Sequence, residues 1–185
     1  MKKLVYLLTV VFLVAACRDD IGNFTEVDRL PVIFPDYTGI VIPPNIAPLN
    51  FKIEEPGVDF EAWIYVDKEN QLTVRSSSPS VIIDQAKWRK MLDANKGKSI
   101  YTDVFVKQKE GGWQKFKTIE NRISEEKIDS HLAYRLINTG YVLWTNLGIY
   151  QRNLENFDEK PILENKSIEY GCLNCHSFAN NDPNK

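Results

Sequence analysis

The sequence predicts a mainly β protein, a β-sandwich or small barrel with one or two short helices. Of its 185 residues, 43% are hydrophobic and 11% aromatic, which is enough to build one buried core. Short apolar or alternating runs, each about the length of a strand, recur between turn-forming segments. Unambiguous helical spacing of apolar residues is found only at residues 85–94. These three observations favour strands over helices through most of the chain.

Residues 17–50 are expected to form a proline-rich tether and an entry strand. Because proline is excluded from helix interiors and central strands, we expect an extended course over the surface of the domain. The prolines are Pro31, Pro35, Pro43, Pro44 and Pro48. The segment is also too apolar for a free linker, so its side chains should pack on the domain that follows. These side chains are Phe34, Tyr37, Ile40, Val41, Ile42, Ile46 and Leu49.

Residues 51–154 are expected to form the β-sandwich-like domain. Its first strands are predicted at residues 50–53, 60–66, 71–76 and 81–83, from β-branched and aromatic residues or apolar alternation. Asp84 is typical of a helix N-cap. The apolar residues Trp88, Met91 and Leu92 then recur at helical spacing, which predicts a short helix over 85–94.

A hairpin and two less regular segments complete the predicted domain. Strands at residues 99–108 and 113–119 flank the sequence Lys109-Glu110-Gly111-Gly112, which has the composition of a tight turn. Residues 127–137 fit both helical and strand spacing, and we favour a strand. Residues 141–154 are predicted to form a short helix that turns into a strand.

The chain begins with the features of a bacterial lipoprotein signal peptide, residues 1–16. A short cationic start precedes an apolar run at residues 4–14, which is too short to span a membrane. The small residues before Cys17 resemble a lipobox, and on that resemblance Cys17 would carry diacylglycerol. An ordinary signal peptide with an incidental cysteine is the alternative.

A small charged cluster, Arg18-Asp19-Asp20, follows Cys17. It resembles the export signal that sends lipoproteins of Bacteroidetes to the outer face of the outer membrane, although such a run also suits a solvated tether. We therefore expect a protein that is lipid-anchored in the bacterial outer membrane and faces the periplasm or the cell surface. Its membrane contact would come from the lipid at Cys17.

The strongest functional signal is Cys172-Leu173-Asn174-Cys175-His176, which reads CxxCH, the attachment motif of a c-type haem. Cys172 and Cys175 would bind the two vinyl groups of one porphyrin, and His176 would be an axial ligand of the haem iron. The motif belongs to a segment at 155–185 that begins with a polar lead at 155–166.

Other uses of the motif remain open. A redox or structural disulfide needs only the two cysteines, and a zinc site would find at most three ligands here. For a sixth iron ligand the candidates are Met91 and His131. Met91 is expected to pack in the core, and His131 to lie at the surface. A five-coordinate or water-ligated iron is therefore the expectation.

Composition argues against several function classes. The net charge is −2 and the basic residues are spread along the chain, so we expect no nucleic-acid partner. The sequence has no G-x-S-x-G element, and His131 is the only histidine outside the CxxCH motif. Hydrolase chemistry is therefore not expected.

Four stretches carry a family resemblance: PPNIAPLNF at 43–51, YRLI at 134–137, GIYQRNL at 148–154 and GCLNCHSF at 171–178. Together they resemble the N-terminal part of a family of Bacteroidetes cell-envelope lipoproteins, the TolB-like or cytochrome c-motif propeller proteins. In that family a β-propeller normally follows the haem motif. Since this chain ends nine residues after His176, residues 155–185 would be a truncated haem-attachment segment.

The predicted function is that of a lipid-anchored envelope protein with haem c, which transfers electrons or senses redox state. Its expected partners are the membrane and either a redox protein or a downstream propeller protein. The alternative is a non-catalytic β-sandwich module for binding or scaffolding in a larger envelope assembly. In that case the CxxC pair would be a disulfide or a vestige.

Overall fold

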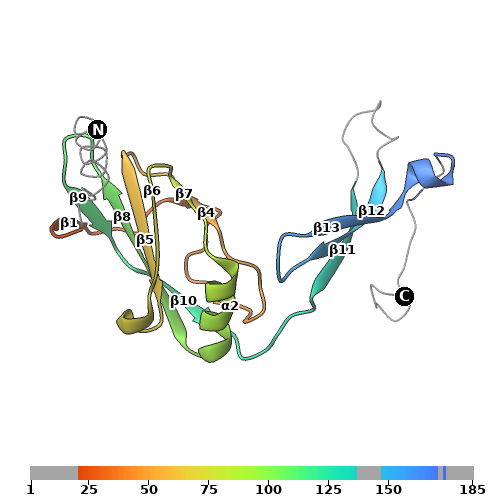
Figure 1. Cartoon of the computed structure of the whole chain (residues 1–185), viewed down its shortest axis with the longest axis horizontal. Coiled ribbons are helices and arrows are strands. Elements are labelled where there is room, and N and C mark those ends of the chain that lie inside the picture. Colours follow the sequence, from red (N-terminus) through yellow and green to blue (C-terminus); the bar gives the residue numbers. More distant parts are fainter. Residues whose placement is uncertain (1–20, 137–146, 171–172, 174–185) are drawn as a thin grey trace, which may run out of the picture.

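A computed structural model of the protein describes residues 21–136, 147–170 and 173. These residues form three β-sheets, one α-helix and two short 3-10 helices (Figure 1). The prediction of a mainly β protein with a short helix is therefore confirmed. The element labels used below are those of Figure 1.

The largest sheet has seven strands and is organised around β8, its longest strand. β5 pairs with one edge of β8, while β9 and β10 share the other edge, one towards each end. β6, β1 and β3 extend the sheet beyond β5, β9 and β10, and the outer pairs β1–β9 and β3–β10 are parallel. The strands are β1 (Phe24–Val27), β3 (Val41–Ile42), β5 (Asp59–Tyr65), β6 (Leu72–Ser76), β8 (Ser99–Lys107), β9 (Trp113–Phe116) and β10 (Ile119–Ile123).

A second layer covers one face of this sheet and closes the core (Figure 1). It consists of a three-stranded antiparallel sheet, β2 (Ile33–Phe34), β4 (Phe51–Ile53) and β7 (Ser80–Val81), together with α2 (Gln85–Ala94). The 3-10 helix η1 (Lys68–Asn70) connects β5 to β6. Alternate residues of β5 and β8 enter the core, as the strand period requires. They are Phe60, Ala62, Ile64, Ile100, Val104 and Val106.

The predicted helix is confirmed with its cap. The Asp84 carboxylate accepts a hydrogen bond from the Lys87 backbone N–H at 2.8 Å. The predicted apolar face, which includes Met91, is buried. The strand predicted at 81–83 is observed as β7 at Ser80–Val81, and Ile82 is exposed between two buried neighbours, although the sequence predicted a buried run.

The proline-rich N-terminal segment packs on the domain through most of the predicted side chains, but the prediction is wrong for Phe34 and Val41, which are 65% and 64% exposed because each points to the solvent side of an edge strand. Tyr37, Ile40, Ile46 and Leu49 contact the core cluster. The segment also contributes β1, β2 and β3, one strand to each of three sheet edges. Edge positions suit a proline-rich segment, because an edge strand can lack some of its ladder donors.

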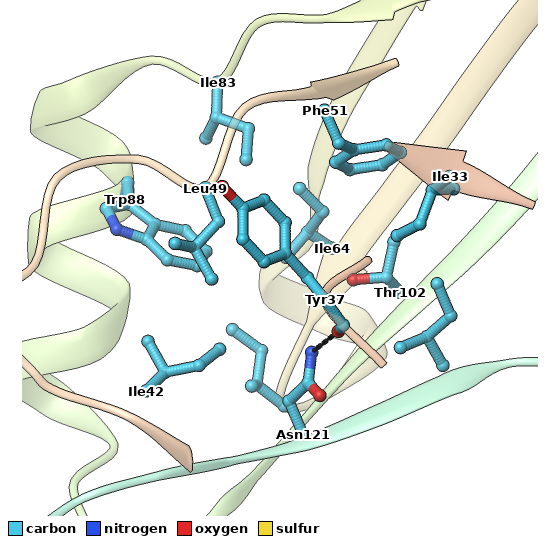
Figure 2. Close-up of a pocket in the computed structure, with 12 residues that line it drawn as sticks. Ile33, Tyr37, Ile42, Leu49, Phe51, Ile64, Ile83, Trp88, Thr102 and Asn121 are labelled. Atoms are coloured by element: carbon cyan, nitrogen blue, oxygen red, sulfur yellow. Dashed lines mark hydrogen bonds between the residues drawn. The ribbon is translucent and has the colours of Figure 1, made fainter. Parts of the chain in front are cut away.

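A small cavity of about 20 Å³ lies between the large sheet and α2 (Figure 2). The Tyr37 ring lies among Leu49 and Ile64 at its centre, and Asn121 holds the Tyr37 carbonyl by a 2.8 Å hydrogen bond. A cavity of this size holds about one water molecule. This cavity is therefore too small for a cofactor.

A separate three-stranded antiparallel sheet follows an extended connection after β10 (Figure 1). It comprises β11 (His131–Leu136), β12 (Gly148–Asn153) and β13 (Glu159–Glu164), and the 3-10 helix η3 (Asn165–Ile168) follows. The strand favoured at 127–137 is confirmed, and so is the strand half of 141–154. The helix half of that segment lies outside the described residues. Where the sequence predicted only a polar lead, the structure has β13. Its polar residues and Pro161 are tolerated because this strand pairs along only one edge.

Candidate functional site

The residues predicted to bind haem lie outside the described part of the chain. These are Cys172, Cys175 and His176, and the predicted lipidation site Cys17 also lies outside it. Leu173, within the motif, is described, and its side chain is buried. In this region the structure therefore describes the chain up to Tyr170, together with Leu173.

The two candidates for a sixth ligand have different surroundings. Met91 is buried on the core face of α2, as the sequence predicts, and would have to leave the core to reach an iron. His131 starts β11 and is half-buried rather than fully exposed. Its ring nitrogens lie 2.8 Å from Ser130 Oγ and 3.4 Å from Asn153 Nδ2. His131 is therefore the more accessible of the two, although it already has polar neighbours.

The chain that leads into the motif is held by η3. Asn165 is fully buried, and its backbone N–H donates to the Leu147 carbonyl at 3.0 Å. Its own carbonyl accepts from the Tyr170 N–H at 2.8 Å. Glu169 and Tyr170 both adopt left-handed backbone, with φ of 51° and 62°. Left-handed backbone costs free energy in residues other than glycine. Contacts around Glu169 and Tyr170 therefore hold this turn in place.

The three-stranded sheet of β11, β12 and β13 has two unlike faces. On one face Tyr134 and Tyr150 are direct cross-strand partners, with ring centroids 6.0 Å apart and an interplanar angle of 23°. The pKa of the Tyr134 phenol is raised because it donates a hydrogen bond to the Glu159 carboxylate on β13. On the other face, Ile149 and Gln151 are buried.

A buried asparagine joins this sheet to the sandwich. Asn45 is 2% exposed. Its amide donates to the Ile128 carbonyl and to Glu155 Oε1, both at 2.8 Å, while its oxygen accepts from the Ile128 N–H at 3.0 Å. Nearby, the Ala47 N–H donates to the Leu154 carbonyl at 2.7 Å, and Arg89 of α2 donates to the Glu155 carbonyl. These bonds hold the three-stranded sheet to the sandwich.

The structure also reveals a buried ionic cluster that sequence reasoning missed. Asp103, 1% exposed, lies on the face of β8 away from the core. Its Oδ1 lies 3.3 Å from Lys115 Nζ and accepts from the Thr118 hydroxyl, while Oδ2 accepts from Tyr65 at 3.2 Å. These residues come from three separate stretches of the sequence, since only Lys115 and Thr118 are near each other, so no local spacing signals the cluster.

A surface depression of about 310 Å³ opens beside this cluster, lined by Tyr65, Tyr101, Thr118 and Glu120. Tyr101 is the cross-strand partner of both Tyr65 and Glu120, so the three side chains form a row across the sheet. The two tyrosine rings lie 5.7 Å apart at 32°. Aromatic faces beside a carboxylate are a composition that suits a small polar ligand.

The tyrosine in this cluster gives a pH-dependent prediction. Burial, followed by the adjacent Asp103 carboxylate, raises the pKa of Tyr65 to about 12. The same phenol ionises near pH 10 in an unfolded chain. Its contribution to stability is therefore complete below about pH 10 and is lost as the pH rises towards 12. We expect the wild type to lose unfolding free energy between these values more steeply than Tyr65→Phe, as measured by urea denaturation at each pH. Equal slopes would contradict the assignment.

Two further features of the described residues concern metal binding and membrane crossing. Within residues 21–136, 147–170 and 173, no three His, Cys, Asp or Glu side chains gather as a metal site. None of the helices in that part of the chain is long and apolar enough to cross a membrane.

Comparison with known proteins adds no family assignment. No protein-family model matches this chain, and no significant match is found among curated proteins.

Proposed function

We propose that this protein is a lipid-anchored envelope protein that carries a covalently bound c-type haem, used for electron transfer or redox sensing. The CxxCH sequence at 172–176 is the single observation that carries the proposal. Haem supplies an iron centre that exchanges single electrons. The membrane anchor is the lipid on Cys17, and the expected partner is a redox protein or a separate propeller protein.

The residues of the motif have distinct roles in this proposal. The thiols of Cys172 and Cys175 each add S–H across one vinyl double bond. Sulfur bonds to one carbon and hydrogen to the other, so nothing is released. His176 offers a neutral imidazole nitrogen to the iron. The donor set of two thiols and one adjacent imidazole fits this cofactor. The hydrogen bonds of Asn165 support the proposal, because they anchor the peptide just before the motif.

The test is expression in a bacterial periplasm that contains haem-attachment machinery. We expect a Soret band that changes on dithionite reduction and an intact mass increased by one haem. Cys172→Ala/Cys175→Ala should lose both signals completely, because both covalent links are removed. Ser177→Ala is the matched control beside the motif and should keep both. A wild-type protein with a featureless spectrum and the mass of the polypeptide alone would overturn the proposal.

A second candidate function is a non-catalytic binding module, and the depression beside Tyr65 and Tyr101 favours it. In that case the two cysteines form a disulfide or have no role. The same mass measurement separates the candidates, because a disulfide lowers the mass by two hydrogens and haem raises it.

A further inference from the structure

The depression lined by two tyrosines lies on the face of the large sheet that points away from the core. Tyr101 alternates along β8 with the core residue Ile100, so its side chain lies on the opposite face. Tyr65 of β5 and Glu120 of β10 are its direct partners on the two neighbouring strands. The depression of about 310 Å³ is therefore built mainly on three adjacent strands, which fix side chains more firmly than loops do.

The two tyrosines give the depression an aromatic surface. Their ring centroids lie 5.7 Å apart, with 32° between the ring planes. Tyr65 is only 8% exposed, and its hydroxyl donates to Asp103 at 3.2 Å, which holds the ring in place. Tyr101 is half-buried and supplies the more accessible ring. Such a ring can pack against the C–H groups of a ligand.

Two polar side chains beside the rings have hydrogen-bonding capacity left. The Thr118 hydroxyl donates to Asp103, and its oxygen has two lone pairs with which to accept. Glu120 is exposed, and its Oε1 accepts from the Ser99 hydroxyl at 2.8 Å. Its second oxygen, Oε2, accepts no hydrogen bond from the described residues. A ligand that donates hydrogen bonds, such as one with several hydroxyl groups, therefore suits this rim.

The charges around the depression are of both signs, which argues against a charged ligand. Asp103 is paired with Lys115 at 3.3 Å. Lys68 of η1 holds its ammonium 5.9 Å from the centroid of one tyrosine ring, and Arg122 is an exposed cation two residues beyond Glu120 on β10. A cationic ligand would meet these two side chains, and an anionic one would meet the Glu120 carboxylate. A neutral ligand avoids both repulsions.

We propose that the depression binds one residue of a neutral carbohydrate, with Tyr101 against the C–H face of the sugar ring. Glu120 and Thr118 accept hydrogen bonds from the sugar hydroxyls. A sugar has the matching chemistry, because one uncharged molecule combines C–H groups with several hydroxyl donors. The inference rests on the second candidate function, the binding module, to which it adds a ligand class, and it does not depend on haem.

The experiment is an NMR titration of the isotope-labelled full chain with D-glucose, D-galactose, D-mannose and N-acetyl-D-glucosamine, each added alone. We expect at least one sugar to shift the backbone amides of Tyr101, Thr118 and Glu120 to saturation. Tyr101→Ala should weaken this binding by about tenfold because the ring contact is lost, whereas Tyr101→Phe should retain it. Glu120→Ala should also weaken it. Glu126→Ala is the matched control, an exposed glutamate outside the depression, and should bind as the wild type does.

Three results would overturn the inference. The first is that none of the four sugars shifts these amides to saturation. The second is that choline shifts them and the sugars do not, which would identify an ammonium site on the tyrosine rings instead. The third is wild-type affinity in both Tyr101→Ala and Glu120→Ala, since the sugar would then bind elsewhere. Haem attachment is measured separately by intact mass, so a failure of the haem proposal leaves this inference standing.

Discussion

Replacing Lys115 by Met is expected to lower the free energy of unfolding by about 3–5 kcal/mol, because breaking a buried ion pair leaves an uncompensated charge. The charge is the Asp103 carboxylate, 1% exposed, which lies 3.3 Å from Lys115 Nζ. Thr118 and Tyr65 would still donate to it, but neither supplies a positive charge. Urea denaturation should show a lower midpoint with an unchanged slope.

The chain offers a matched control for this variant. Lys117 forms an ion pair with Asp28 at 2.7 Å, and both partners are exposed. Lys117→Met should therefore cost about 0–1 kcal/mol. The double variant Asp103→Asn/Lys115→Met should recover much of the lost stability, since the buried charge is then gone. Equal effects of Lys115→Met and Lys117→Met would show that Asp103 does not depend on its cation.

Replacing Asn45 by Ala is expected to cost on the order of 3 kcal/mol, because each buried polar group that loses its partner costs about 1–3 kcal/mol. The side chain satisfies both backbone groups of Ile128 and also bonds Glu155. The loss should be local as well as global, since these bonds join the sandwich to the three-stranded sheet. Hydrogen exchange should therefore accelerate at the Ile128 amide more than in the core of β8.

An exposed asparagine provides the comparison for Asn45. The Asn70 amide bonds only to Asp67 at the surface, so Asn70→Ala should change stability by no more than about 0.5 kcal/mol. If Asn45→Ala leaves hydrogen exchange at the Ile128 amide unchanged, backbone hydrogen bonds hold the sandwich and the three-stranded sheet together instead. The bond from Ala47 to Leu154 is one of these.

The sequence was sufficient to predict the helices and strands that depend on residues close together in the chain. The helix over 85–94 follows from its cap and apolar spacing, both within a dozen residues. The hairpin of β8 and β9 follows from its turn, where Gly111 and Gly112 take φ of 91° and 81°. The strand at β13 was missed because its pairing uses backbone groups that a polar sequence does not disclose.

Of the candidate functional residues, some could also be predicted from local sequence and others could not. The CxxCH motif is contiguous and can be read from the sequence, because one cofactor requires its three side chains at fixed spacing. The surface of the three-stranded sheet cannot be read in this way. Tyr134 and Tyr150 become neighbours only through the register of β11 and β12, and the exposure of Leu132 depends on which face is covered.

The sequence by itself thus determined the β-rich class, the short helix, the tight hairpin and the motif that predicts haem, since each depends on residues close together in the chain. Only the tertiary structure decided where the N-terminal strands pair, that Asp103 and Lys115 meet, and that Asn45 joins the sandwich to the last sheet. These features arise between residues far apart in sequence. Their positions depend on sheet register and burial, which no local pattern of residue types specifies.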